Sequence, residues 1–357
     1  MSKKRILLLG LVVITVLVTG CGRKSGGSSA VTTNEDGTVS VPATTLQAQI
    51  DPNDTYYVVC AFDQIEFFNA HKMAWKEAGK MFNVNTVWVG IAGGDLTEMV
   101  TLLDTTIAKN PAGIVVFGLD EGLKPSINKA VAAGIPTMTW ESDIVSSDRD
   151  TWIGSAGHDL GYTGGKLYAE YLKGKGKIAI LSMPGIEMYD SRMDGYKEAF
   201  AAYPGIEVVA TGDTKTDEVV AVQAAKDILT AHPDLTGFVC CDATGPTGAT
   251  TAIREAGLEG KIQVLGLDRD TALLENIKNG TVFGSIVQND ATMLVWALQD
   301  LIFGKYFNNA LLTTDNRAAG ARLLPNTIAC SINLITPDNV DYYLEANKKY
   351  KEYLDKN

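Results

Sequence analysis

The chain has few of the residues that metalloenzymes and hydrolases use. It contains three histidines in 357 residues, His71, His158 and His232, which lie far apart in sequence and form no HExxH pattern. It also lacks a GxSxG nucleophile elbow and a GxxxxGK[ST] phosphate loop. Paired carboxylates could still form a glycosidase site. We nevertheless expect that the protein is not an enzyme and holds no metal and no cofactor.

Cysteine and positive charge are also scarce. Four of the five cysteines, Cys60, Cys240, Cys241 and Cys330, lie in apolar strand-like segments and form no CxxC motif. We expect buried thiols, since a bridge between the adjacent Cys240 and Cys241 would be strained. Lysine and arginine number 31 against 42 acidic residues, which gives a formal net charge of −11. This balance argues against binding to nucleic acid or to anionic lipid.

The chain has one long apolar run, at its start. Lys3, Lys4 and Arg5 precede the apolar segment 6–18, and small residues lead to Cys21 in the order Val-Thr-Gly-Cys. The run is too short for a permanent span, and its charged start and small residues describe a removable signal. We expect a lipoprotein signal at 1–20, with lipid on Cys21 holding the mature protein on the extracytoplasmic face of the cell membrane. A plain secretory signal is the alternative.

The next segment, 21–54, is rich in small and polar residues and predicts a flexible tether. About 300 residues remain, enough for two domains of ordinary size. No second apolar stretch reaches membrane length, so the chain is not a permease.

From residue 56 onward, short apolar strand patterns alternate with helical patterns. Buried runs such as 113–117, 137–140 and 263–267 are each followed by a segment of helical periodicity. This alternation predicts an α/β fold with parallel sheets. The strands are too numerous for one compact sheet, so we expect two doubly wound lobes joined by a hinge.

The lobe boundaries follow from the order of these elements. We expect one lobe at 55–156, completed by about 289–325, and a second at 157–288, completed by about 326–357. The hinges should lie at Ser155–Gly157 and Gln288–Asp290, with a third crossing near Pro325.

Polar and aromatic residues follow several predicted strands, where doubly wound sheets bind ligands. Glu141, Arg192, Asp242, Asp268 and Gln288 stand at these positions. Carboxylates accept hydrogen bonds from sugar hydroxyls, and an arginine supplies donors. Rings such as Phe67, Phe68 or Trp140 could cover the apolar face of a sugar. One arginine against three acids would repel an anionic ligand.

Each of these positions also has a structural interpretation. A polar residue after a strand often caps the next helix, which we favour for Asp290 and Ser191. We favour ligand contact for Asp242 and Asp268. Because Phe67 and Phe68 are adjacent, a helix cannot point both at one core.

The ordered phrases of the chain resemble the sugar-binding proteins of the ribose, galactose and xylose type, which are type I periplasmic binding proteins of ABC importers. These motifs are, in order, GIP at 134–136, WESD at 140–143, SRMDGY at 191–196, DATG at 242–245, VLGLD at 264–268 and IVQ at 286–288. The resemblance implies sugar contacts from seven residues: Phe67, Phe68, Glu141, Arg192, Asp242, Asp268 and Gln288. It also implies a monomer whose partners are a sugar or polyol and an ABC permease with separate ATPase subunits.

The chain departs from the ribose-type pattern at three places. Ile65 and Glu66 stand where an asparagine is usual, Ser142 replaces an arginine, and Asp242 often is an asparagine. Ribose itself is therefore an unexpected ligand. The WESD phrase also resembles receptors for rhamnose and autoinducer-2. A sensory receptor that presents a sugar-like signal to a membrane kinase or chemoreceptor is therefore the alternative function.

Overall fold

The computed structural model describes residues 32–33, 39–40, 50–306 and 322–356. The chain divides into two compact units, Met1–Ala48 and Gln49–Asn357. In the first unit, β1 (Thr32–Thr33) pairs with β2 (Val39–Ser40) in antiparallel orientation. The expected signal, Cys21 and most of the expected tether lie outside the described residues. None of the helices in the described ranges has the length and apolar character needed to cross a membrane.

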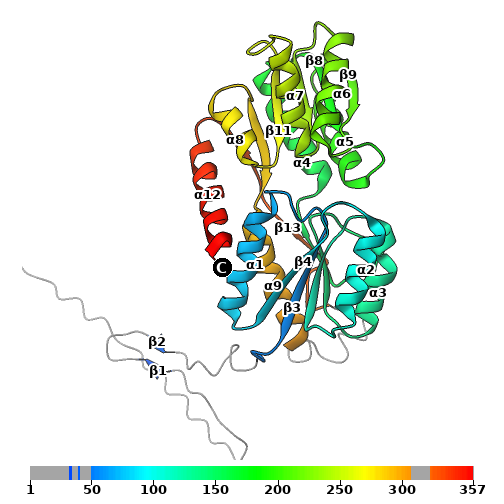
Figure 1. Ribbon diagram of the computed structural model, residues 1–357, viewed down its shortest axis with the longest axis vertical. Helices are drawn as coiled ribbons and strands as arrows, with labels where there is room; N and C mark the ends of the chain where they lie inside the picture. The colour runs from blue at the N-terminus through cyan, green and yellow to red at the C-terminus, as the bar shows by residue number, and fades with distance from the viewer. Residues whose placement is uncertain (1–31, 34–38, 41–49, 307–321, 357) are drawn as a thin grey trace, which may run out of the picture. The chain divides into compact units, whose positions relative to one another are not determined.

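The second unit contains two six-stranded sheets, each in its own lobe (Figure 1). In the first lobe the strand order is β13-β7-β6-β5-β3-β4, and every pairing is parallel. The strands are β3 (Thr55–Cys60), β4 (Asn85–Gly90), β5 (Gly113–Phe117), β6 (Thr137–Trp140), β7 (Thr151–Gly154) and β13 (Thr327–Ala329). The helices are α1 (Phe68–Phe82), α2 (Leu96–Ile107), the 3₁₀ turn η1 (Glu121–Leu123), α3 (Lys124–Ala132) and α9 (Asp290–Tyr306).

The second lobe has the strand order β14-β12-β11-β10-β8-β9. Its strands are β8 (Lys175–Ser182), β9 (Gly205–Asp213), β10 (Gly237–Cys240), β11 (Gln263–Leu267), β12 (Gly284–Gln288) and β14 (Ile332–Ile335). All pairings are parallel except that of β12 with β14. The helices are α4 (Gly157–Tyr171), α5 (Glu187–Ala201), α6 (Glu218–Ala231), α7 (Thr244–Glu255) and α8 (Thr271–Lys278). The expected α/β fold of two doubly wound lobes is confirmed.

The cores explain why these segments form strands and helices. β5 has the sequence GIVVF and is buried along its whole length, as parallel strands covered on both faces must be. Figure 1 shows α1 and α9 on one face of this sheet and α2 and α3 on the other. Asp95 caps the start of α2, because its side chain accepts a hydrogen bond from the Glu98 N–H at 2.8 Å.

Within the described residues, three segments carry the chain between the two sheets. The first two connections lie between β7 and α4 and between β12 and α9, where the hinges are expected. The third differs from the sequence prediction. β13 at Thr327–Ala329 still pairs with β7 of the first lobe, so the crossing comes between Ala329 and Ile332 rather than near Pro325. Sequence patterns did not reveal β7, β13 and β14, which are four residues long or shorter.

The last helix, α12 (Val340–Lys356), packs against elements of both lobes. It contacts α8 of the second lobe and α1 of the first (Figure 1). Asn347 accepts hydrogen bonds from the Arg269 guanidinium and donates one to the Arg269 carbonyl. Farther along α12, the Tyr353 hydroxyl contacts Glu77 and Lys80 of α1. The helix therefore lies alongside the connection between the lobes and links them.

Candidate functional site

All seven sequence-predicted ligand residues line one cavity between the lobes. The cavity has a volume of about 90 Å³. Phe67, Phe68 and Glu141 come from the first lobe, and Arg192, Asp242, Asp268 and Gln288 come from the second. They meet because the carboxyl ends of the parallel strands in both sheets face this space. The structure therefore brings the predicted residues together; their contact with a ligand stays a prediction.

Glu141 and Gln288 connect the lobes beside the first two crossings. The Ser155 N–H donates to Gln288 Oε1 at 3.1 Å, so the amide nitrogen of Gln288 faces the other way. That nitrogen donates to Glu141 Oε2 at 2.7 Å. Glu141 itself has a φ of 60°, in the left-handed region, immediately after β6. A non-glycine residue in this conformation is strained, and such residues concentrate at functional sites.

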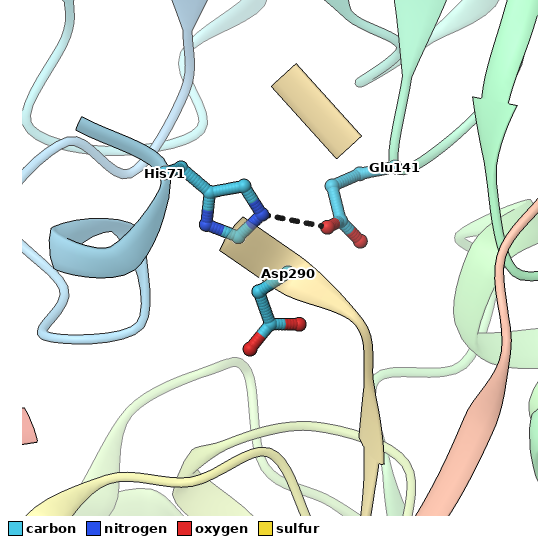
Figure 2. Close-up of side chains that lie close together, drawn as sticks. All are labelled: His71, Glu141 and Asp290. Atoms are coloured by element: carbon cyan, nitrogen blue, oxygen red, sulfur yellow. Dashed lines mark ion pairs between the residues drawn. The ribbon is translucent and has the colours of Figure 1, made fainter. Parts of the chain in front are cut away.

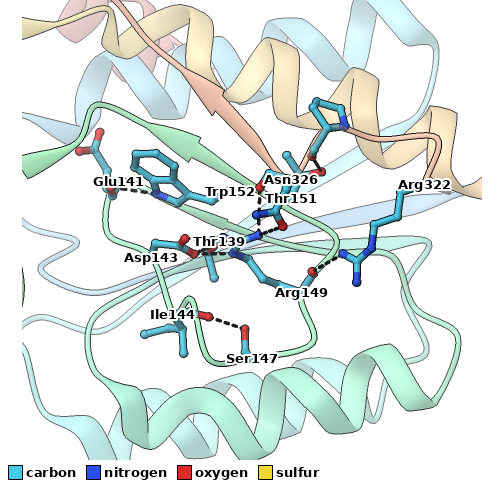
Figure 3. A network of polar contacts seen from close by, with 11 residues as sticks. Thr139, Glu141, Asp143, Ile144, Ser147, Arg149, Thr151, Trp152, Arg322 and Asn326 are labelled. Atoms are coloured by element: carbon cyan, nitrogen blue, oxygen red, sulfur yellow. Dashed lines mark hydrogen bonds and ion pairs between the residues drawn. The ribbon is translucent and has the colours of Figure 1, made fainter. Parts of the chain in front are cut away.

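A second network holds the backbone around Glu141 in place (Figure 3). The Trp152 indole N–H donates to the Glu141 carbonyl at 3.2 Å. Asp143 forms an ion pair with the buried Arg149 and accepts a hydrogen bond from Thr139 at 2.6 Å. Arg149 also donates to the Asn326 carbonyl at 3.0 Å. The residues after Glu141 thus fix its position rather than enlarge the set of ligand contacts.

Arg192 enters the cavity from α5, and close helix packing sets its position. A Cβ added at Gly161 of α4 would lie 1.9 Å from the Arg192 carbonyl oxygen, and one added at Gly195 would lie 2.1 Å from that of His158. Two glycines therefore allow α4 and α5 to approach closely. The Arg192 guanidinium donates to the Cys241 carbonyl at 2.8 Å. Its buried Nε has no hydrogen-bond partner among the described residues.

Asp268 follows β11 and also has a positive φ, of 76°. Burial raises the pKa of its carboxyl group to about 8, although the Arg192 guanidinium favours the charged form; Asp270, Glu141 and Asp242 add to the rise. No described side chain or backbone N–H donates to this carboxylate. Like Arg192, Asp268 therefore keeps hydrogen-bonding capacity for a ligand.

Asp242 differs from Asp268, although both follow strands of the second lobe. Its Oδ1 accepts hydrogen bonds from the backbone N–H groups of Thr244 at 2.9 Å and Gly245 at 2.7 Å, at the start of α7. Its Oδ2 accepts one from the Thr214 hydroxyl. Thus the helix-capping interpretation, which we did not favour here, describes most of its hydrogen bonds. Asp242 lines the cavity with little remaining capacity.

Aromatic rings form the first-lobe wall of the cavity. Phe67 lines it, and Phe68 does so while only 2% exposed and packed in the core. Phe62 and Phe117 also contribute and were not predicted. The prediction that the Trp140 ring could cover the apolar face of a sugar is wrong. Its side chain is fully buried behind Phe68 and does not line the cavity, because residues at the end of a doubly covered strand alternate between two packed faces.

Sequence reasoning also missed the remaining lining residues: Ile65, Met188, Tyr189, Thr216, Ala243 and Thr244. Most lie in loops or first helical turns, where side-chain direction cannot be deduced from periodicity. An open groove of about 590 Å³ adjoins the cavity and shares Glu141, Met188 and Arg192 with it. The groove offers a route from solvent to these residues.

His71, Glu141 and Asp290 form a buried cluster next to the cavity (Figure 2). His71 Nε2 lies 3.3 Å from Glu141 Oε1. We expected Asp290 to cap α9. That interpretation was wrong, since neither carboxylate oxygen has a hydrogen-bond partner among the described residues. Burial raises the pKa of Asp290 well above its usual range, and the nearby Glu141 adds to this.

The cysteines within the described residues are all free, as expected. Cys60, Cys240 and Cys241 are buried. Burial raises the pKa of the Cys241 thiol to about 12, although the nearby Ser182 hydroxyl and Arg192 favour the thiolate. These thiols are therefore packing residues.

A family model described as "Periplasmic binding protein domain" matches residues 56–305. Among curated proteins, the xylose/arabinose-binding protein XylF of Sulfolobus acidocaldarius is 27% identical over 60% of this chain and 57% of its own length. The xylitol-binding protein of Mycolicibacterium smegmatis is 27% identical over 66% of this chain and 68% of its own length. The chain thus spans less than two thirds of the XylF relative.

Solved structures extend the similarity over most of the chain. The sugar-binding protein of a sugar ABC transporter from Bacillus halodurans superposes with a TM-score of 0.75 at 29% identity, covering 82% of this chain and 100% of that protein. The arabinose-binding protein AraP from Geobacillus stearothermophilus has a TM-score of 0.73 at 27% identity, with coverages of 82% and 99%.

Proposed function

Since the chain belongs to the periplasmic binding protein domain family, we propose that it captures a neutral monosaccharide or polyol between its lobes and delivers it to an ABC importer. The convergence of Glu141, Arg192, Asp268 and the phenylalanines on one interlobe cavity carries this proposal. Similar proteins named for binding xylose, arabinose and xylitol support it.

The available hydrogen-bonding groups define the ligand chemistry. Arg192 presents hydrogen-bond donors, and Asp268 presents a carboxyl group to which no described residue donates a hydrogen bond. Hydroxyl groups both donate and accept, so a polyol can satisfy both residues. A ligand carboxylate or phosphate would meet Glu141 and Asp242, and Arg192 is the one arginine among the described lining residues that could offset them. We therefore favour uncharged ligands over amino acids and anions.

The cavity volume implies movement during binding. The cavity of about 90 Å³ is smaller than typical small-molecule pockets, which have volumes of about 300–1,000 Å³. The lobes must therefore separate to admit a sugar and settle around it afterwards. Ligand contact with both lobes favours the closed arrangement by population shift.

A thermal-shift screen of the protein against pentoses, hexoses, polyols and amino acids tests the ligand class. A ligand at 100 times its Kd should stabilise the fold by about 2.7 kcal/mol. Calorimetry should then show at least tenfold weaker binding for Arg192→Ala and for Asp268→Ala, since each leaves a buried partner unsatisfied. Arg254→Ala and Asp234→Ala change exposed residues of the same lobe and serve as controls. Stabilisation by amino acids or anions alone contradicts the assignment.

We further propose that lipid on Cys21 retains the protein at the membrane, where the importer acts. The supporting observation is the sequence Val18-Thr19-Gly20-Cys21 after a charged and apolar start. Intact-mass analysis of membrane-extracted protein should show a chain that begins at Cys21 and carries lipid. Cys21→Ala should release the protein from the membrane fraction. Unmodified protein, or unchanged retention of the variant, contradicts anchoring.

Delivery to an importer and presentation to a sensor predict different phenotypes. Deleting the gene should abolish uptake of the labelled sugar found in the screen, and wild-type protein should restore it. If uptake persists while sugar-dependent gene induction is lost, the sensory alternative replaces the transport role.

A further inference from the structure

The cluster of His71, Glu141 and Asp290 has the composition of a metal site. The nitrogen and carboxylate oxygens that these residues offer all lie within 4.8 Å of one another. The residues come from α1, the end of β6 and the start of α9, three elements that are distant in sequence. Figure 2 shows the His71 ring directed toward the Glu141 carboxylate, with the Asp290 side chain beside them. Sequence spacing could not reveal this arrangement, and we had expected no metal.

The cluster also concentrates unsatisfied polar atoms. His71 Nε2, Glu141 Oε1 and both oxygens of Asp290 are buried and have no hydrogen-bond partner among the described residues. His71 is fully buried, and Asp290 is 2% exposed. Leaving buried polar atoms unpaired destabilises the folded protein. Because all four lie together, a single bound species could satisfy them.

The orientation of His71 selects the kind of species. Its Nδ1 lies 3.4 Å from the Phe67 carbonyl oxygen, which can only accept a hydrogen bond. The Nδ1–H tautomer therefore leaves the lone pair of Nε2 pointing toward Glu141, as in metal-binding histidines whose other nitrogen donates to a carbonyl. A lone pair facing a carboxylate is repulsive unless a positive species lies between them. One proton could bridge this pair, but it would leave Asp290 without a partner.

The geometry and charge both suit a divalent transition-metal ion. Two tetrahedral ligands with bonds of about 2.1 Å lie about 3.4 Å apart, and His71 Nε2 and Glu141 Oε1 are separated by 3.3 Å. Two ionised carboxylates would offset the ion's two positive charges. The Arg269 guanidinium, whose charge acts on Asp290, is engaged by Asn347 and the Tyr343 carbonyl. One imidazole with two carboxylates is a ligand set that zinc accepts.

We propose that His71, Glu141 and Asp290 bind one divalent transition-metal ion of the zinc type beneath the interlobe cavity. Such an ion would fix Glu141 Oε1 while its Oε2 remains on Gln288. It would also join the start of α9, next to the second crossing, to α1 and β6. The proposal does not depend on the identity of the ligand in the cavity.

Metal titration of the purified full-length protein after EDTA treatment tests this site. Metal analysis after dialysis should show one equivalent of Zn²⁺ per chain, and Zn²⁺ should raise the melting temperature. Co²⁺ should bind with the same stoichiometry and give the visible absorption of a site with low coordination number. His71→Ala and Asp290→Asn should each weaken Zn²⁺ binding at least tenfold.

His158 provides a matched control, because its Nε2 lies 3.0 Å from Glu198 in an exposed pair. His158→Ala should leave the stoichiometry and affinity unchanged. If a proton or a water molecule occupies the cluster, the wild-type protein will bind no more metal than His71→Ala, which overturns the proposal. Equal loss in His158→Ala also overturns it. Should the His71 and Asp290 variants fail to fold, absence of the Co²⁺ absorption from the wild-type protein is decisive. Calorimetry of the EDTA-treated protein measures sugar binding separately from metal binding.

Discussion

At the scale of single residues, Asp268 links the cavity to pH. Its folded-state pKa of about 8 lies above the ordinary 3.8, because burial disfavours the carboxylate more than Arg192 favours it. Between about pH 4 and pH 8 the folded protein therefore holds a proton that the unfolded chain releases. The free energy of unfolding must fall as pH rises through this window, by up to about 1.4 kcal/mol per pH unit from this group.

Asp268→Asn removes this titration, so the variant should become progressively more stable than the wild-type protein as pH rises from 5 to 8. Urea unfolding at each pH measures the difference. Asp234→Asn alters an exposed carboxylate paired with Lys177, and its stability difference should stay constant over the same range. If the stability difference between Asp268→Asn and the wild-type protein is constant from pH 5 to pH 8, then Asp268 is ionised over that whole range.

The sequence located the cavity residues because parallel strands deliver their carboxyl ends to a common place. That rule does not say what each residue does there. Asp242 and Asp268 follow neighbouring strands in the same way, yet Thr214, Thr244 and Gly245 engage the first and leave the second available. Likewise, nothing in the spacing of residues 71, 141 and 290 indicates that they meet.

At the scale of structural elements, Glu66 joins the lobes at the rim of the cleft. It lies before α1 in the first lobe, and its carboxylate accepts hydrogen bonds from Thr271 of α8 in the second. The Thr271 N–H lies 2.9 Å from Oε2, and the hydroxyl lies 2.5 Å from Oε1. Glu66 thus caps a helix of the opposite lobe, at the positive end of its dipole. This contact exists only while the lobes are together.

Removing this interlobe cap should lower the population of the closed state and therefore the apparent sugar affinity. We expect Glu66→Ala to weaken binding about fivefold, which corresponds to about 1 kcal/mol. Asp217→Ala is the control, since Asp217 caps α6 within one lobe by accepting from Val219 and Val220. It should lower stability by about 1 kcal/mol without changing affinity. If the Glu66→Ala and Asp217→Ala variants bind the sugar with equal affinity, the Glu66 cap has no role in closure.

Element prediction succeeded where a run was long or fully buried and failed where pairing alone defines the strand. β5, β6 and β11 were placed with their observed bounds, because each is a short apolar run between turn residues. β13 and β14 are half exposed and have no such pattern. β13 forms a strand because it pairs with the edge of β7, and β14 forms one because it pairs with the edge of β12.

At the scale of the whole second unit, three connections and α12 determine how the lobes can move. We expect the connections to permit rotation between the sheets. α12 contacts both α8 and α1, and we expect this link to limit how far the lobes open on that side. The hydrogen bonds of Gln288 with Ser155 and Glu141 lie between the first two crossings. When the lobes open, these hydrogen bonds must either break or move as a group with one lobe. Hinge closure is therefore the motion that the fold allows.

Small-angle scattering measures this motion directly. Saturating sugar should reduce the radius of gyration of the wild-type protein, because the ligand contacts both lobes only in the closed state. With the same sugar concentration, Arg192→Ala should retain the larger radius, since it loses a contact from the second lobe. A radius that does not change at saturation, with binding confirmed by calorimetry, would mean that the lobes are already closed before the sugar arrives. A cavity of about 90 Å³ makes that outcome difficult to reconcile with sugar entry.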